Sequence, residues 1–494
     1  MTSATPTTPL HDLADADLAT LPDTLEAPSY QRSALTPSIV HLGVGGFHRA
    51  HLAVYVDDLC QRGNTDWAIV GAGVMPGDVR MADALLTQRG LYALISRGAE
   101  TTTRIIGSIV DFVHVAGLDD TDGADELIAR IADPATKIVS LTITEGGYPV
   151  HDDSGLFDAD RAANSAAFQI LVRGLDRRRR SGGGPLTVVS CDNIVHNGRV
   201  TRTATIGVAD TVGDDLTDWI REHVRFPNSM VDRITPATTD ADREWLAAEH
   251  GLVDRWPVVA EPFRQWVLED DFATAMPPFA DVGVLVTDDV EPYEILKLRM
   301  LNASHSCLAY LAALAGFQLV DEVLRDDDFR EFVGAFMRDE AAPVLPAVPG
   351  VDVAAYAAEL LERFANPAIG DQIARLCLDG SSKFPKFLLP TVRAQLDAGG
   401  SIRFAALALA GWCRYLQGRD DGGHAIELAH DPLLADLTGF AAAADTDPAV
   451  FLSNKTVFGD DLGADARFAP AFVDAFTSLQ ASGVRSTVAA CIGR

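Results

Sequence analysis

Residues 38–63, SIVHLGVGGFHRAHLAVYVDDLCQRG, indicate how the first half of this 494-residue chain folds. The apolar run 38–44 is typical of a buried parallel strand, and a glycine-rich turn separates it from a helical pattern. A strand, a glycine turn and a helix form the first unit of a dinucleotide-binding fold. We therefore predict an α/β chain that begins with a Rossmann-type parallel-sheet domain.

The turn itself indicates a cofactor site. Gly43 supplies the tight turn and Gly45 lets the backbone approach a pyrophosphate, although His48 stands at the third glycine position of the GxGxxG pattern. Arg49 lies in the first turn of the helix, where a cation can neutralise phosphate. The cofactor-binding residues expected here are Gly43, Val44, Gly45, Gly46, Phe47 and Arg49.

A second apolar strand at 67–74 is followed by Met-Pro-Gly-Asp, which ends at Asp78. An acidic residue after the second strand binds the adenosine ribose hydroxyls and repels a 2′-phosphate. Asp78 therefore favours NAD over NADP, and the alternative is an ordinary loop aspartate.

Two more apolar strands, at 138–144 and 186–190, run into the loops EGGY (145–148) and CDNIVHNG (191–198). Ligands of open parallel sheets lie beyond the carboxyl ends of the strands, so we expect Thr144 and Glu145 at the cofactor. Asn193 is an uncharged donor able to bind an alkoxide. A last strand at 281–287 precedes a boundary near residue 286, which divides the chain into a dinucleotide-binding domain, with its polar lead-in, at 1–286 and a mostly helical substrate and catalytic domain at 287–494.

The second domain opens with EPYEILKLRMLNASHSCLAYLAALAG, residues 291–316, which the pattern predicts to be one buried helix. At about 100° per residue, Glu294, Asn302 and His305 fall within roughly 140° of Lys297. A buried amine of this kind is suited to take a proton near neutral pH. The alternative is that Lys297 extends to the helix rim while Asn302 and His305 are satisfied core groups.

Lysine is rare in this chain, with five among the forty basic residues. A lysine within an apolar helix therefore indicates a need for an amine that can lose its proton, which a guanidinium cannot do at neutral pH. Farther along, Arg375 lies on a predicted helix and Lys383 in a cationic loop, SSKFPKF. Both are candidates to bind substrate, and the alternative is a surface turn.

The composition excludes several functions. Forty basic against seventy acidic residues give a net charge of −30, which repels nucleic acid and anionic membranes. The six cysteines show no metal-ligand spacing, and His48 and His51 lack the HExxH glutamate, so we expect no metal. The chain shows neither a membrane-length apolar run nor a signal peptide, so a cytoplasmic location is expected.

Taken together, the motifs resemble a known family. IVHLGVGGFHRAH, VSLTITEGGY, SCDNIVHNG, FPNSMVDRITP, WPVVAEPFRQWVLED, the Lys297-x4-Asn302-x2-His305 helix and DGSSKFPKF occur in one chain in this order. The chain thereby resembles the polyol-specific long-chain dehydrogenases over about residues 38 to 490. The resemblance implies a zinc-independent, NAD-dependent and reversible oxidation of an acyclic polyol, with D-mannitol and D-fructose as the expected pair.

The resemblance also implies roles for individual residues. Lys297 is similar to the general base, and Asn193 and Asn302 to the donors that hold the substrate oxygen. His305 matches a substrate-positioning residue and Glu294 a proton route to solvent. Asp232 and Arg375 match positions that contact sugar hydroxyls. Gly77 stands where family members can carry a second acidic residue, which makes exclusion of NADP less strict.

Two alternatives stay open at this point. A sister activity on D-arabinitol, another hexitol or fructuronate would share the fold, the cofactor and the lysine motif, and the region of Arg375 and Lys383 would discriminate among these substrates. A non-catalytic NAD-binding sensor would keep the fold and bind the cofactor without turning over a sugar.

Overall fold

The computed structural model describes residues 11–494 apart from 16, 23, 152 and 153. The chain divides into two compact units, Met1–Val290 and Glu291–Arg494. The first is a Rossmann-type α/β unit and the second is helical, so the predicted fold class is confirmed. Each unit is described by itself.

The main sheet of the first unit has six parallel strands in the order β6-β3-β2-β7-β8-β9. The strand bounds are β2 Pro37–Leu42, β3 Ala68–Gly73, β6 Ile109–His114, β7 Ile138–Leu141, β8 Leu186–Ser190 and β9 Val224–Arg225. The predicted strands at 38–44, 67–74, 138–144 and 186–190 are four neighbours in this sheet. The first three end one to three residues earlier than predicted, and the fourth has the predicted bounds.

Strand β2 is buried because both faces of the sheet are covered. Ile39 packs into one apolar core together with helix α2, whereas Val40 and Leu42 pack into a second core with helices α4 and α6. Alternate residues of one strand therefore enter two cores, which explains why the neighbours Ile39 and Val40 are both apolar.

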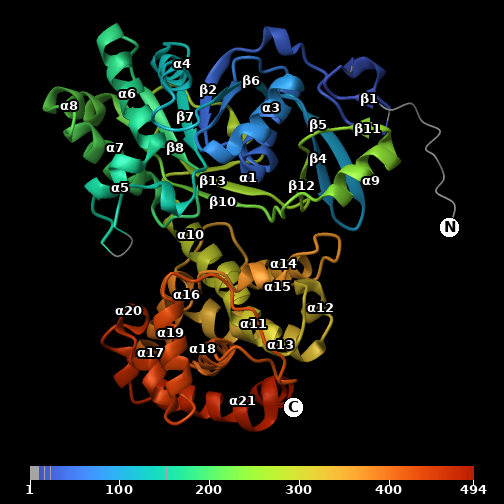
Figure 1. Cartoon of the computed structure of the whole chain (residues 1–494), viewed down its shortest axis with the longest axis vertical. Coiled ribbons are helices and arrows are strands. Elements are labelled where there is room, and N and C mark those ends of the chain that lie inside the picture. Colours follow the sequence, from blue (N-terminus) through green and yellow to red (C-terminus); the bar gives the residue numbers. More distant parts are fainter. Residues whose placement is uncertain (1–10, 16, 23, 152–153) are drawn as a thin grey trace. The chain divides into compact units, whose positions relative to one another are not determined.

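Helices flank the sheet of this unit, as Figure 1 shows. Their bounds are α1 Gly46–Ala50, α2 Leu52–Gln61, α3 Val79–Thr87, α4 Thr121–Ala132, α5 Ala159–Asn164, α6 Ala166–Ser181, α7 Asn197–Asp210, α8 Asp214–His223 and α9 Asp240–His250.

Smaller sheets complete the first unit. They join β12 Val258–Ala260 with β4 Tyr92–Arg97 and β5 Thr101–Ile106, β10 Ser229–Asp232 with β13 Gln265–Glu269 and β14 Leu285–Thr287, and β1 His11–Asp12 with β11 Leu252–Val253. The prediction of a strand over 281–287 was wrong in part. Residues Phe279–Val282 form a 3-10 turn that ends at Gly283, whose φ is +94°, and only β14 is extended.

The second unit is built from helices. Their bounds are α10 Glu291–Lys297, α11 Ala303–Leu314, α12 Val320–Leu324, α13 Asp327–Ala335, α14 Val353–Phe364, α15 Ile373–Leu376, α16 Gly380–Phe387, α17 Leu389–Ala398, α18 Arg403–Tyr415, α19 Leu434–Ala443, α20 Lys455–Phe458 and α21 Phe468–Cys491. Helix α11 packs against α15, α16 and α18, so it is buried nearly all round.

Two sequence expectations about these helices need correction. The predicted single helix over 291–316 is interrupted by a π-helical segment, η6, at Leu298–Asn302. The predicted loop SSKFPKF lies instead within α16, which contains Pro385. None of the helices in the described residues combines the length and apolar character that crossing a membrane requires.

Candidate active site

The glycine turn after β2 is held by neighbouring strands. The N–H groups of Gly43 and Val44 donate to the carbonyl of Ala72, at 2.9 and 3.1 Å. The Thr142 hydroxyl donates to the carbonyl of Gly43 at 2.7 Å and accepts from Nε2 of His41 at 2.8 Å. Gly43 has a φ of +86°, which glycine adopts without strain.

His48 occupies the third glycine position without entering the turn. Its ring is fully buried and stacks on the ring of His41, with 3.4 Å between centroids. Neither of its ring nitrogens has a hydrogen-bond partner among the described residues, and burial lowers the pKa of His48 well below its ordinary value. A histidine is tolerated here because it is neutral and packs beneath the strand.

A cavity of about 850 Å³ adjoins the glycine turn. It is bordered by the carboxyl ends of β2, β3 and β7, as expected for a ligand site of a parallel sheet. Among the predicted cofactor residues, its lining includes Gly43, Val44, Gly45, Asp78 and Thr144.

Asp78 closes the turn after β3. Its carboxylate accepts a hydrogen bond from the N–H of Met75 at 3.0 Å. A side chain on Gly73 would meet Cβ of Asp78 at 2.8 Å, so glycine in β3 makes room for the acid at the cavity. Asp78 thus caps this turn and lines the cavity.

The other predicted cofactor residues do not line this cavity. Gly46 and Phe47 begin helix α1, and the ring of Phe47 stacks on His51. Arg49 is buried, donates to the carbonyl of Trp256 and lies over the ring of Tyr92. This geometry gives Arg49 a structural role and does not favour the predicted phosphate contact. Glu145 is exposed in the turn after Thr144.

Two glycines of the turn should respond differently to alanine. A Cβ on Gly43 would lie 2.4 Å from the carbonyl oxygen of Thr142, whereas a Cβ on Gly45 would meet nothing nearer than 3.9 Å. We expect Gly43→Ala to lower the free energy of unfolding by about 2 kcal/mol or more. Gly45→Ala should leave that stability within about 0.5 kcal/mol but weaken NADH binding roughly tenfold, because its methyl group enters the cavity.

Thermal unfolding and titration of NADH fluorescence measure the two effects separately. Gly46→Ala is the matched control, since a Cβ there makes only ordinary contacts, the nearest at 3.6 Å. Equal stability of Gly43→Ala and the wild type would contradict the strain argument.

Asn193 is exposed in the loop after β8, and buried side chains fix both ends of this loop. Asp192 accepts hydrogen bonds from the N–H groups of Ile143 and Thr144. Asn197 donates to the carbonyls of Ser190, Asp192 and Ser229. Asp192 and Asn197 were not predicted from sequence, although a charged residue so close to the end of the apolar strand 186–190 was a usable signal.

Asp232 is the last residue of β10 and is buried, with 5% of its surface exposed. It pairs in register with Gln265 of β13, whose carbonyl bonds to Nε2 of His51. The start of β10 is tied to the Asn193 loop, because Ser229 and Asn197 exchange hydrogen bonds. The first unit therefore links the elements that carry Asn193 and Asp232.

In the second unit, the π-helical segment η6 stands between Lys297 and Asn302. The N–H of Ala303 bonds to the carbonyl of Leu298, five residues earlier. Under this i to i+5 bonding, residues five apart lie on one face, as residues four apart do in an α-helix. Lys297 and Asn302 therefore lie closer around the helix than the regular pattern predicted.

Lys297 and Glu294 are both buried, at 4% and 7% exposure. They lie one turn apart on α10. Because residues three apart lie on the same side of a helix, the buried amine and the buried carboxyl share one face of α10.

His305 lies on α11 with its ring against Phe364, 4.2 Å between centroids. Its Nε2 is buried and has no hydrogen-bond partner in the described part of the chain. Burial lowers the pKa of His305 to about 3; Asp371 opposes this shift, and the cations Arg375, Arg363 and Lys383 reinforce it. The imidazole is therefore neutral at neutral pH.

The second unit brings together three of the predicted site residues, namely His305, Arg375 and Lys383. Arg375 forms a bidentate ion pair with Asp371, at 2.7 and 2.6 Å, and Lys383 donates to the carbonyl of Leu376 at 3.2 Å. Both cations act on the electrostatics of His305. This cluster has the donors needed to bind hydroxyl groups.

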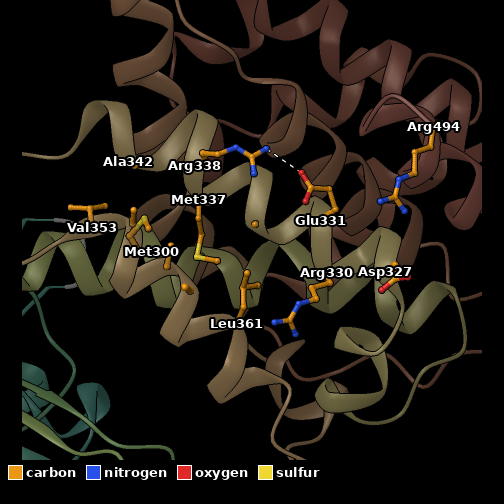
Figure 2. Close-up of a pocket in the computed structure, with 14 residues that line it drawn as sticks. Met300, Asp327, Arg330, Glu331, Met337, Arg338, Ala342, Val353, Leu361 and Arg494 are labelled. Atoms are coloured by element: carbon orange, nitrogen blue, oxygen red, sulfur yellow. Dashed lines mark hydrogen bonds and ion pairs between the residues drawn. The ribbon is translucent and has the colours of Figure 1, made fainter.

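A separate cavity of about 810 Å³ lies in the second unit (Figure 2). Met300 of η6 and Met337 line its apolar part, and Arg338 pairs with Glu331 at its edge. None of the predicted site residues, all of which lie in the described part of the chain, lines this cavity. In the described residues, no three or more histidine, cysteine, aspartate or glutamate side chains are grouped so as to hold a metal ion.

The chain matches two family models. The mannitol dehydrogenase Rossmann domain matches residues 37–280, and the mannitol dehydrogenase C-terminal domain matches residues 289–480. Among curated proteins, a mannitol 2-dehydrogenase of Aspergillus fumigatus is 44% identical over 482 residues, which cover 94% of this chain and 95% of the relative.

Two solved structures are also similar. Mannitol 2-dehydrogenase of Pseudomonas fluorescens, in a ternary complex with NAD and D-mannitol, is 40% identical with a TM-score of 0.88, covering 98% of this chain and 100% of that one. A substrate-free D-sorbitol dehydrogenase is 34% identical with a TM-score of 0.86, covering 95% and 98%.

Proposed function

The chain belongs to the mannitol dehydrogenase family, and on this premise we propose that it is an NAD-dependent oxidoreductase that converts D-mannitol to D-fructose and back. The observation that carries the proposal is the similarity, over nearly the whole chain, to an enzyme solved with NAD and D-mannitol. The two units then serve as the dinucleotide-binding domain and the substrate and catalytic domain.

The cavity beside the glycine turn fits the cofactor. Gly45 leaves space where a larger side chain would fill the cavity, and Asp78 stands where a ribose would bind. Bound NAD would accept the hydride from the alcohol carbon. Gly43, Val44, Gly45, Asp78 and Thr144 would bind and orient it.

The remaining roles fall to polar side chains of the two units. Lys297 takes the hydroxyl proton, and Glu294 passes it on toward solvent. Asn193 and Asn302 donate hydrogen bonds to the substrate oxygen as its charge develops. Neutral His305 orients the substrate, and Asp232, Arg375 and Lys383 bind its other hydroxyl groups. The buried Lys297–Glu294 pair and the π segment beside Asn302 support these assignments.

The direct test follows NADH absorbance with D-fructose, D-xylulose and D-fructuronate side by side, and then NAD reduction with D-mannitol and D-sorbitol. Preference for D-fructose and D-mannitol supports the proposal. Preference for fructuronate or xylulose would move the chain to a sister activity, and preference for D-sorbitol would favour the activity of the similar sorbitol enzyme. NADH binding without turnover of any of these sugars would indicate a sensor.

Cofactor choice provides a second test. Asp78→Asn keeps an oxygen that caps the Met75 N–H but removes the charge, so we expect kcat/KM with NADP to rise roughly tenfold relative to NAD. Asp83→Ala, an exposed acid on the next helix, is the control for net charge. An unchanged NADP to NAD ratio in Asp78→Asn would show that this aspartate does not select the cofactor.

A further inference from the structure

A buried carboxylate joins the two loops that follow β7 and β8. Oδ2 of Asp192 accepts hydrogen bonds from the N–H of Ile143 at 3.0 Å and the hydroxyl of Tyr148 at 2.7 Å. Oδ1 accepts from the N–H of Thr144 at 2.9 Å. Asp192 is 8% exposed, so these bonds replace water almost completely.

Thr144 needs such support because its backbone is strained. Its φ of +61° and ψ of 166° belong to a region that is essentially confined to glycine. Strain of this kind persists only where surrounding contacts impose it. Thr144 also lines the cavity beside the glycine turn, so its conformation shapes that cavity.

The other loop is fixed by the same residue. Directly after Asp192 comes Asn193, and the carbonyl of Asp192 accepts a hydrogen bond from Asn197 at 3.1 Å. The N–H of Asp192 donates to the Ser190 hydroxyl at 3.2 Å, which in turn bonds to the Tyr148 hydroxyl. Residues 143–148 therefore hold the side chain of Asp192, and Ser190 and Asn197 hold its main chain.

We propose that Asp192 is a positioning residue, which holds Thr144 in its strained conformation at the cofactor cavity and fixes the backbone that presents Asn193. The part of this proposal that concerns Asn193 rests on the proposed function. The part that concerns Thr144 and the cofactor cavity requires only that the protein bind NADH.

The pKa of Asp192 gives this proposal a measurable pH dependence. Burial raises the pKa of Asp192 to about 6; the hydrogen bonds from Ile143, Tyr148 and Thr144 limit the shift, and the charge of Glu145 adds to it. The other titratable groups facing it, Tyr148 and Cys191, have pKa values raised by burial and stay neutral. Only Asp192 among these buried groups changes charge near pH 6.

The test compares Asp192→Asn with Asp254→Asn. Asp254 is a matched control in the same unit, since it is buried and accepts from the N–H groups of Ala93 and Trp256 and from Gln88. Both variants should lower the thermal midpoint. Only Asp192→Asn should also weaken NADH binding and lower kcat for D-fructose, each by about tenfold or more, because an amide cannot accept from all three donors.

The pH profile separates positioning from general stability. In the wild type and in Asp254→Asn, the Kd of NADH should rise as pH falls through about 6, because protonation removes an acceptor from the Thr144 loop. In Asp192→Asn this transition should disappear. Equal effects of the two variants on Kd, or a retained transition in Asp192→Asn, would overturn the proposal.

Thr144→Gly tests the same idea if Asp192→Asn does not fold. Glycine adopts this backbone conformation without strain, so the low-pH weakening of NADH binding should become shallower. A profile equal to that of the wild type would contradict the proposal. Because NADH binding is measured without substrate, failure of the sugar assays would refute the proposed function and leave the cofactor part of this inference standing.

Discussion

Lys297→Ala is expected to lower kcat at neutral pH by about 10³-fold or more, equivalent to roughly 4 kcal/mol of transition-state stabilisation. On the proposed function, the substrate hydroxyl would lose the base that takes its proton as the hydride departs. The Kd of NADH should change less than about twofold, because Lys297 belongs to the unit that does not contain the cofactor cavity. Stopped-flow turnover and NADH titration measure the two quantities.

Two controls make the result specific. Lys297→Arg keeps a cation in the helix but supplies no base at neutral pH, so it should be as inactive as the alanine variant. Lys386→Ala removes an exposed lysine from α16 and should retain full activity. Near-native turnover by Lys297→Ala would eliminate this lysine as the base.

Asn302→Ala should lower kcat by about 10²-fold to 10³-fold, the usual cost of removing one preorganised donor from a developing oxyanion. Asn193→Ala should have an effect of the same order. KM for D-fructose should rise much less than kcat falls, since these donors act mainly on the charge that develops in the transition state. Steady-state kinetics in both reaction directions measure the two changes.

A substitution at Asn302 can keep the shape of the side chain while removing its hydrogen-bond donor. Asn302→Asp is isosteric but offers only acceptors when ionised, so it should be at least as impaired as Asn302→Ala. Ser306→Ala removes a hydroxyl that donates to the Asn302 carbonyl at 3.2 Å, and it should stay within about threefold of the wild type. A comparable loss in Ser306→Ala would attribute the effect to helix distortion.

Much of the first unit could be predicted from sequence because burial leaves a clear pattern. Ile39, Val40 and Leu42 are apolar because both faces of β2 pack into cores, and Gly43 marks the turn that only glycine accommodates. The same argument located the cavity-lining Asp78 and Thr144 at strand ends. Sequence spacing does not show that the guanidinium of Arg49 bonds to the carbonyl of Trp256, and its contact with phosphate stays a prediction.

Other features depend on contacts that no local pattern contains. The segment SSKFPKF was predicted to be a cationic loop, but it forms part of α16, and the hydroxyl and N–H of Ser381 bond to Asp431, fifty residues away. The role of Asp192 likewise depends on donors from residues 143–148. Hydrophobic periodicity cannot report hydrogen bonds between distant loops.

The π segment also joins α10 and α11, which pack differently, into one continuous helix. Helix α10 buries Tyr293 and Leu296, whereas α11 is buried nearly all round. Removing one residue from Leu298–Asn302 would restore regular winding and leave α10 and α11 in nearly the same relative orientation, because five residues of π-helix turn the chain about as far as four of α-helix. The extra residue therefore changes which side chains share a face within the segment, while the buried faces of the two flanking helices keep their orientation.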